Sequence, residues 1–576
     1  MHCVKNHWKI FLCLALAVFT VITAGCNKTD GIGESTDNPV DTTPVVSDLS
    51  IVESGSTQYT IITSENTSDK TSDAVRAMLD AFNTATGVKP KWTDDYLYPG
   101  DPVPVKEILV GITNREESKA VLREVRYGEY MIRTVGDKIV IAAWDEDSLV
   151  NACSAFISDI KQIGSNGTLA VPGDYARQDV GLSLLAQMPH YGAADEQVQF
   201  IDLADAVYML LAKDTDLAEF EAYYGILEAA GYTCVSKHQM ADNHYAVYTS
   251  EKKIIHAIYT AKDTAARIAI EDAYDMSLFT EQPYEKVCEP SVTMIGQENY
   301  NKDDEGFYYQ KGMSLIFRLE DGRFIIVDGG GHNKTSLSSL YTTLQDLAPD
   351  KDHITVAAWF ITHAHSDHVG TFLKFTEEGY HKSIRVENII HHLVETDKDR
   401  TLQTREAFAA EYTNTNIIKA HTGQKIYAGG AEIEMLFTFA DLMPAAVDDL
   451  NATSLMFRVT MGGKTVLILG DSTTYTSGQL VKTYGDYLKS DIVQIAHHGK
   501  TGGTVALYEK IHADVLLWPG GVANFKGEGT MDCLRARDYN AKALSLAKEA
   551  YIAGDKVFTL PMPYTPEDLE TVHIIY

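Results

Sequence analysis

Residues 361–370 read Ile-Thr-His-Ala-His-Ser-Asp-His-Val-Gly, which places three histidines and one aspartate within six positions. The apolar run 354–361 leads into this stretch, and the amphipathic run 369–375 follows it. This order predicts a buried strand, a polar turn and a helix. Imidazoles together with a carboxylate are ligands that a divalent ion such as zinc prefers. The turn therefore offers four candidate metal ligands: His363, His365, Asp367 and His368.

Two later stretches repeat the layout of a short apolar run that ends in a potential ligand. Residues 467–471 read Leu-Ile-Leu-Gly-Asp, and residues 495–499 read Ile-Ala-His-His-Gly. We therefore expect Asp471 and His497 to join the first four ligands. The alternative interpretation is a solvated turn that is rich in histidine by chance, and the repeated strand context argues against it.

This set of motifs resembles the signature of the metallo-β-lactamase-fold hydrolases over roughly residues 291–576. The resemblance implies two divalent metal ions, with zinc as the expected metal, that share a water molecule and lower its pKa. The implied roles are His363 and His365 on one ion, Asp367, His368 and His497 on the other, Asp471 as the bridge, Asp328 as a support, and Asp367 and His498 as catalytic candidates.

The closer likeness is to the hydrolase domain of bacterial competence proteins, which form DNA-uptake channels. The shared features are the Asn-x-x-Ser of residues 451–454, the Gly-Asp of 470–471 and the His-His-Gly of 497–499. The chain departs from that pattern because Lys500 stands where a serine is usual, and because residues 524–527 lack a late histidine. These departures bear on the prediction of the substrate more than on the prediction of the metal ligands.

The β-lactamases of this fold carry one further histidine between the first motif and the bridging aspartate. Here that interval holds four histidines, and the sequence does not choose among them. His391 and His392 are the first choice because they directly follow a short apolar run, residues 389–390. The full set of candidates is His381, His391, His392 and His421.

The composition is that of a multidomain globular protein with a strong excess of acidic groups. The 576 residues suffice for about three or four domains. The net charge of −31 argues against strong binding to duplex DNA or to an anionic membrane surface. The seven cysteines are scattered without a Cys-x-x-Cys pair, which favours buried free thiols; any disulfide pairing stays open.

The first 50 residues indicate export. Lys5 and Lys9 precede the apolar run 10–24, which is typical of a signal peptide. The residues Ala-Gly before Cys26 resemble a bacterial lipoprotein processing site, so residues 1–26 are interpreted as a lipoprotein signal peptide with Cys26 as the lipid-bearing residue. An uncleaved anchor or ordinary secretion is the alternative. Residues 27–50 are polar and are expected to form a flexible linker. The lipoprotein and the anchor interpretations both place the rest of the chain on the extracytoplasmic face of the cell membrane.

Residues 51–175 are expected to form an α/β domain because strand-like and helix-like runs alternate. Residues 108–116 and 132–141 resemble the non-catalytic N-terminal domain of β-hexosaminidases and α-glucuronidases. That likeness allows a cell-wall or glycan contact, but a packing or spacer role is favoured because fold alone does not give function.

Two further domains are expected after it. Residues 176–290 predict a small α+β domain, with a helix that Asp216 caps and that packs on an antiparallel sheet. For residues 291–576, the strand–turn–helix patterns and the resemblance imply an αββα sandwich with the metal site on one edge. The fold class is therefore multidomain, mixed α/β and α+β.

Three functions are compatible with these features. The preferred one is a surface-tethered binuclear metallohydrolase of phosphodiesters or phosphate esters. The second is a metallohydrolase of lactones, amides or β-lactams. The third is a glycan-binding surface protein whose metal site is structural.

Overall fold

The computed structural model describes residues 47–576, except 66, 99–101, 123, 126, 179–183, 193–197, 298–311, 395, 397–398, 445–446 and 528–535. The expected signal peptide, Cys26 and most of the linker lie outside the described residues. Residues Asp48–Tyr576 form one compact unit. No helix among the described residues is long and apolar enough to cross a membrane.

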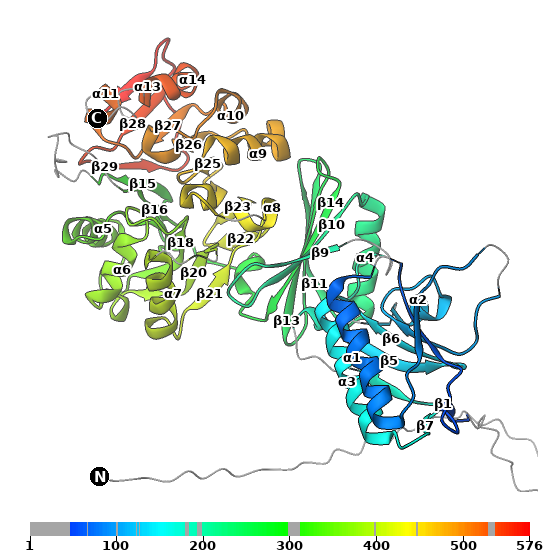
Figure 1. Ribbon diagram of the computed structural model, residues 1–576. Coiled ribbons are helices and arrows are strands. Elements are labelled where there is room, and N and C mark those ends of the chain that lie inside the picture. Colours follow the sequence, from blue (N-terminus) through cyan, green and yellow to red (C-terminus); the bar gives the residue numbers. More distant parts are fainter. Residues whose placement is uncertain are drawn as a thin grey trace, which may run out of the picture. The chain divides into compact units, whose positions relative to one another are not determined.

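The first sheet is mixed and carries its helices as expected (Figure 1). Ser68 caps α1 by accepting a hydrogen bond from the backbone N–H of Thr71, and the apolar face of α1 is buried. The elements are β2 (Thr60–Thr63), α1 (Asp69–Thr86), β3 (Lys91–Asp94), β4 (Glu107–Val110), α2 (Glu116–Leu122), β5 (Tyr130–Val135), β6 (Lys138–Ala143), α3 (Glu146–Ile163) and β8 (Ala176–Gln178), with β1 (Leu49–Val52) and β7 (Leu169–Val171) as a separate pair.

The second sheet is antiparallel throughout, as predicted for residues 176–290. Asp216 caps α4 (Leu217–Ala229) by accepting a hydrogen bond from the N–H of Glu219. The strands are β9 (Val198–Asp202), β10 (Tyr208–Lys213), β11 (Thr233–Met240), β12 (Asn243–Thr249), β13 (Lys253–Thr260) and β14 (Ala265–Asp272).

The remaining strands form two eight-stranded sheets. The first contains β15 (Ser291–Ile295), β16 (Ser314–Arg318), β17 (Phe324–Asp328), β18 (Thr355–Ile361), β19 (Arg385–Val386), β20 (Asn388–His391), β21 (Asn416–Lys419) and β29 (Val557–Pro561). The second contains β22 (Lys425–Ala428), β23 (Ala431–Phe437), β24 (Met456–Met461), β25 (Lys464–Ile468), β26 (Ile492–Gln494), β27 (Val515–Trp518), β28 (Glu549–Ile552) and β30 (His573–Ile575).

Apolar side chains join the two sheets into a sandwich with helices outside. Between the sheets, Phe360 of β18 stacks on Phe457 of β24, with ring centroids 4.6 Å apart. The outer face of the first sheet packs against α5 (Lys334–Leu347), α6 (Gly370–Glu377) and α7 (Asp399–Glu411). The outer face of the second packs against α9 (Thr474–Tyr484) and α10 (Val505–Ile511), which Figure 1 shows beside β25 and β26. The expected αββα architecture is therefore confirmed.

The candidate site lies where parallel strands end. Strands β17, β18 and β20 run parallel in one sheet, and β25, β26 and β27 run parallel in the other. Each motif follows the carboxyl end of such a strand, so both sheets contribute to the same edge of the sandwich. Away from this edge, Cys153 is a buried free thiol, as expected. Cys234 and Cys288 are also free thiols, but Cys234 is exposed and Cys288 is half-buried, while Cys533 lies outside the described residues.

Candidate metal centre

Asp328 fixes the first motif from the end of the neighbouring strand β17. Its fully buried carboxylate accepts hydrogen bonds from the backbone N–H of Thr362 (2.8 Å) and the hydroxyl of Thr362 (2.7 Å). The Nδ1 atom of His368 lies 2.7 Å from the same carboxylate. Because this contact occupies Nδ1, the other nitrogen of His368, Nε2, is left to face the centre.

One group of candidate ligands surrounds His363. The ligand atoms of His363, His368 and Asp471 all lie within 4.8 Å of one another, and all three residues are buried. His365 adds a fourth ligand atom, because its Nδ1 lies 3.0 Å from Nε2 of His363. This group brings together four of the six predicted metal ligands.

A second group surrounds His498. The ligand atoms of Asp367, His368 and His498 again lie within 4.8 Å of one another. Nε2 of His498 is 3.2 Å from Oδ2 of Asp471 and 3.4 Å from Oδ2 of Asp367. Asp471 therefore lies between the two groups, as a bridging carboxylate would.

His497 lies farther out than its neighbour. Its Nε2 is 3.8 Å from Oδ2 of Asp471, and its Nδ1 is 3.4 Å from the hydroxyl of Thr501. Both His497 and His498 adopt positive φ angles, 49° and 54°, which are uncommon for residues other than glycine. The structure thus places the predicted ligand His497 beside the cluster and the predicted catalytic residue His498 inside it.

The loop after these histidines is closely packed at Gly499. A Cβ atom on Gly499 would lie 2.1 Å from Cε2 of Trp518. The side-chain amide of Asn540 donates to the carbonyl of Gly499 at 2.7 Å. These contacts hold the two histidines in their strained conformation, and such strain is often found at functional sites.

The charges of the cluster suit a cation. Burial raises the pKa of Asp471, but His368 and His498 outweigh burial and hold it well below its usual value. Burial lowers the pKa of His368, but Asp471 and Asp328 outweigh burial and raise it well above its usual value. Burial, assisted by His368, holds the pKa of His363 well below its usual value. At neutral pH Asp471 is therefore ionised and His363 neutral, which are the forms that bind metal, and His368 would release its proton when a cation binds.

Two atoms of the cluster are unsatisfied. Among the described residues, Oδ1 of Asp471 and Nδ1 of His498 are buried without a hydrogen-bond partner. An unpaired buried carboxylate oxygen is costly, and it needs a partner to offset that cost. Convergent imidazoles around an open carboxylate oxygen fit a divalent cation.

Sequence reasoning missed the residue that holds the bridging turn. Oε1 of Gln494 accepts hydrogen bonds from the backbone N–H groups of Leu469 and Gly470, both at 2.8 Å. Its Nε2 donates to the carbonyls of Gly470 (3.1 Å) and Ile495 (2.7 Å). The only sign of this role in the sequence was an amide within the apolar run that precedes His497.

The four histidines left open by the sequence have other partners. His381 pairs with Glu411 at 3.0 Å, and Nδ1 of His392 contacts the carbonyl of Ala420 at 2.7 Å. His391 accepts a hydrogen bond from the N–H of Leu393 through its Nδ1. Within the described part of the chain, the two ligand groups above contain none of the four.

His421 belongs instead to a separate buried group with His256 and Glu271, whose ligand atoms also lie within 4.8 Å. Its ring stacks on that of His256, with centroids 4.4 Å apart and planes 24° from parallel. Nδ1 of His421 already pairs with Asp441 at 3.0 Å, and Nε2 of His256 lies 2.6 Å from Glu271. One nitrogen of each ring is therefore occupied by a carboxylate of the protein.

The comparison with protein families identifies the domain around the centre. Residues 311–516 match the model of the metallo-beta-lactamase superfamily. These residues form a metallo-β-lactamase fold domain. The match includes all six predicted metal ligands of the metallo-β-lactamase domain, together with Asp328 and His498. No curated protein matches this chain.

Solved structures similar to this chain include three with low scores. The metallo-beta-lactamase fold protein YhfI from Bacillus subtilis is 18% identical with a TM-score of 0.29, and the match covers 47% of this chain and 99% of that protein. A diphosphatase from the PhnP family is 12% identical with a TM-score of 0.25, and the match covers 40% of this chain and 85% of the diphosphatase. A CmlA beta-hydroxylase mutant is 15% identical with a TM-score of 0.24, and the match covers 46% of each chain.

Proposed function

We propose that the metallo-β-lactamase domain is a binuclear metal-dependent hydrolase that cleaves phosphodiesters, and small ones more readily than duplex DNA. The observation that carries this proposal is the convergence of two ligand groups on Asp471, whose buried Oδ1 has no partner among the described residues. His363 and His365 would hold one ion, and Asp367, His368 and His498 the other, with zinc as the expected metal. Two ions in such a site supply a water of lowered pKa and offset negative charge that develops on the substrate.

The residues behind the ligands keep them in place before a substrate arrives. Asp328 orients His368, and the hydroxyl of Ser454 accepts a hydrogen bond from the backbone N–H of Asp471 at 3.0 Å. Gln494 binds the backbone just after β25, at Leu469, and just after β26, at Ile495. Ligands fixed in this way need little reorganisation during the reaction.

We infer that His498 rather than His497 is the metal ligand of the His-His-Gly motif. His498 is buried against Asp367 and Asp471, whereas the side chain of His497 is 22% exposed. His498→Ala should therefore reduce metal content and turnover at least about tenfold more than His497→Ala. The opposite ranking would return the ligand role to His497 and leave His498 as a donor to the substrate.

The choice of phosphodiester rests on local features. The Asn-x-x-Ser, Gly-Asp and His-His-Gly motifs favour the competence-type pattern, although no comparison tests that likeness or the likeness of residues 51–175 to the hexosaminidase N-terminal domain. Lys500 lies close enough to contribute, after burial, to the low pKa of His497, and a lysine suits a phosphoryl oxygen better than a neutral amide. The net charge of −31 disfavours long nucleic acid.

A panel of substrates tests the reaction class. The purified chain, with zinc or manganese added, is assayed on bis(p-nitrophenyl) phosphate, single-stranded DNA, nitrocefin and a simple lactone. We expect turnover of the phosphodiesters, with the small ester cleaved faster than DNA. Turnover of nitrocefin or the lactone alone would contradict the substrate class while leaving a metallohydrolase.

We also propose that Cys26 carries a lipid that holds the chain on the outer face of a membrane. The apolar run 10–24 and the small residues before Cys26 support this. In cell fractions, the protein should follow the membrane, and Cys26→Ser should abolish lipid attachment. Labelling of both forms with the same lipid would contradict this proposal.

A further inference from the structure

A groove of about 1320 Å³ lies at the edge of the sandwich opposite the metal centre. In the parallel pair β18–β19, Thr355 lies opposite Arg385, which lines the groove. Farther along β18, Ile361 precedes the metal motif. Strand β18 has seven residues and therefore separates the two edges by about 20 Å. The groove is thus distinct from the proposed catalytic site.

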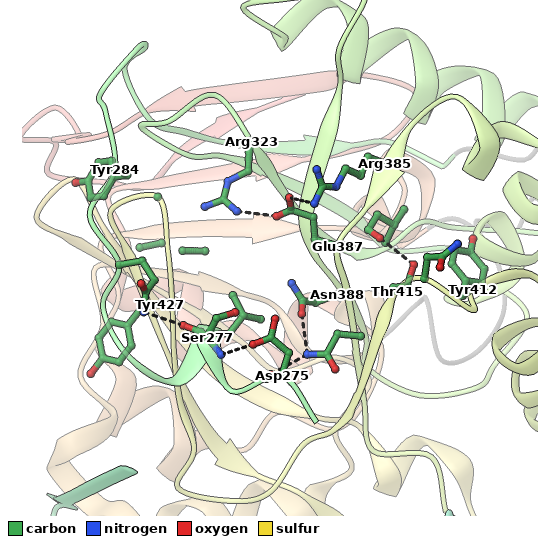
Figure 2. Close-up of a pocket in the computed structure, with 18 of the residues that line it drawn as sticks. Asp275, Ser277, Tyr284, Arg323, Arg385, Glu387, Asn388, Tyr412, Thr415 and Tyr427 are labelled. Atoms are coloured by element: carbon green, nitrogen blue, oxygen red, sulfur yellow. Dashed lines mark hydrogen bonds and ion pairs between the residues drawn. The ribbon is translucent and has the colours of Figure 1, made fainter. Parts of the chain in front are cut away.

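Three segments that are distant in sequence form the walls of this groove. They are the segment after β14, the starts of β19, β20 and β21, and the hairpin of β22 and β23. Figure 2 shows Tyr284 and Tyr427 on one side of it, Tyr412 on the other, and Glu387 and Asn388 between them. Tyr284 is 40% exposed and Tyr427 is half-buried, so these two rings are open to a ligand, whereas the ring of Tyr412 is buried against Phe372.

The polar floor is already ordered. Glu387 accepts a hydrogen bond from Arg323 at 2.7 Å and forms an ion pair with Arg385 at 3.3 Å. Asn388 donates to the carbonyl of Ala357 at 2.7 Å and accepts from Asn416 at 3.1 Å. The side chain of Arg385 is nonetheless 75% exposed, so most of its N–H groups remain open to a ligand. A floor that is ordered before binding loses little entropy when a ligand binds.

The charges along the groove argue against an anionic ligand. Five carboxylates line it, against three lysine or arginine side chains. An anion such as phosphate is usually held by an excess of cationic donors. A neutral ligand that both donates and accepts hydrogen bonds is better suited. The carboxylates are Asp275, Glu281, Glu387, Glu411 and Glu432, and the cations are Arg323, Lys382 and Arg385.

We propose that this groove binds a neutral oligosaccharide. Sugar hydroxyls can pair with the planar carboxylate, amide and guanidinium groups of the floor, while tyrosine rings present an apolar face and a polar tip. The volume exceeds the range of about 300–1,000 Å³ that is typical of sites for drug-sized ligands, which favours an extended chain. The groove would hold the hydrolase domain on a glycan surface without contributing to its chemistry.

Calorimetric titration of the full-length protein with chitotetraose, cellotetraose and maltotetraose tests this proposal. At least one should bind, and Arg385→Ala should weaken that binding about tenfold, or ~1.4 kcal/mol. Lys334→Ala is the matched control, because Lys334 is an exposed cation on α5 of the same domain and is absent from the groove. The control should leave affinity unchanged, and both variants should keep wild-type phosphodiester turnover.

Three results would overturn the proposal. They are failure of all three sugars to bind at millimolar concentration, sugar binding that Arg385→Ala leaves unchanged, and preferential binding of inorganic phosphate that Arg385→Ala abolishes. Because turnover is measured on the same variants, a failed glycan site is distinguishable from a failed catalytic site.

Discussion

Two buried carboxylates of this chain, Glu107 in the first sheet and Asp471 at the metal centre, have the same charge but different partners. Both oxygens of Glu107 are taken, since Arg115 donates to them at 2.9–3.2 Å and Lys138 lies 2.9 Å away. Among the described residues, Asp471 has only imidazoles around Oδ2, and its Oδ1 has no partner.

The difference separates a structural charge from a binding site. Arg115 also donates to the carbonyl of Asp95 at 2.9 Å, and Lys138 pairs with Glu117 at 3.0 Å, so the Glu107 cluster is complete without a ligand. The Asp471 cluster instead combines a neutral imidazole with an open carboxylate oxygen. Burial of charge alone does not indicate function; an incomplete set of partners does.

The largest effect is expected from Asp471→Asn. The amide keeps the shape but loses the charge and one acceptor oxygen, so both ligand groups should hold a cation more weakly. Turnover should fall to background, and metal content should drop from about two ions per chain to one or none. Elemental analysis and a phosphodiester assay check this. Wild-type turnover in this variant would show that Asp471 is only structural.

The matched substitution in the Glu107 cluster is Glu107→Gln. It leaves Arg115 and Lys138 buried without their carboxylate, which should destabilise the N-terminal part of the chain by about 3–5 kcal/mol. Denaturant unfolding measures this loss, and the folded variant should retain full metal content and turnover. A stable Glu107→Gln protein with reduced turnover would reverse the assignment of the two clusters.

A smaller effect is expected from Asp328→Asn, which acts through His368. The amide cannot accept from Thr362 and His368 as the carboxylate does, so His368 loses part of its orientation. Metal affinity or turnover should fall about 10–100-fold. Thr371→Ser serves as a conservative control in the following helix α6, because the hydroxyl that donates to the carbonyl of Gly331 is retained. Equal losses in both variants would indicate a general packing defect.

The sequence was sufficient for the parts of the molecule that local pattern determines. The apolar runs before His363, Asp471 and His497 correspond to β18, β25 and β26, and their shared edge follows from the parallel order of the strands. The metallo-β-lactamase fold of this region is confirmed by the family match. The boundaries proposed for the preceding domains stay predictions.

The details that the sequence did not resolve depend on tertiary contacts. Which of His497 and His498 faces the centre is determined by a loop that Trp518 and Asn540 hold, and both contacts are distant in sequence. Gln494 was missed because an amide in an apolar run does not show which backbone groups it contacts. The groove was missed for the same reason, since its walls meet only in the folded chain.

The most direct test of the account is the metal content of the wild-type chain, measured together with its turnover during chelation and metal return. We expect about two divalent ions per chain. Both quantities should fall together on chelation and recover together when zinc or manganese is added. Full turnover in the metal-free protein, or a folded protein that takes up no divalent ion, would contradict the claim that Asp471 and its histidines form a metal centre.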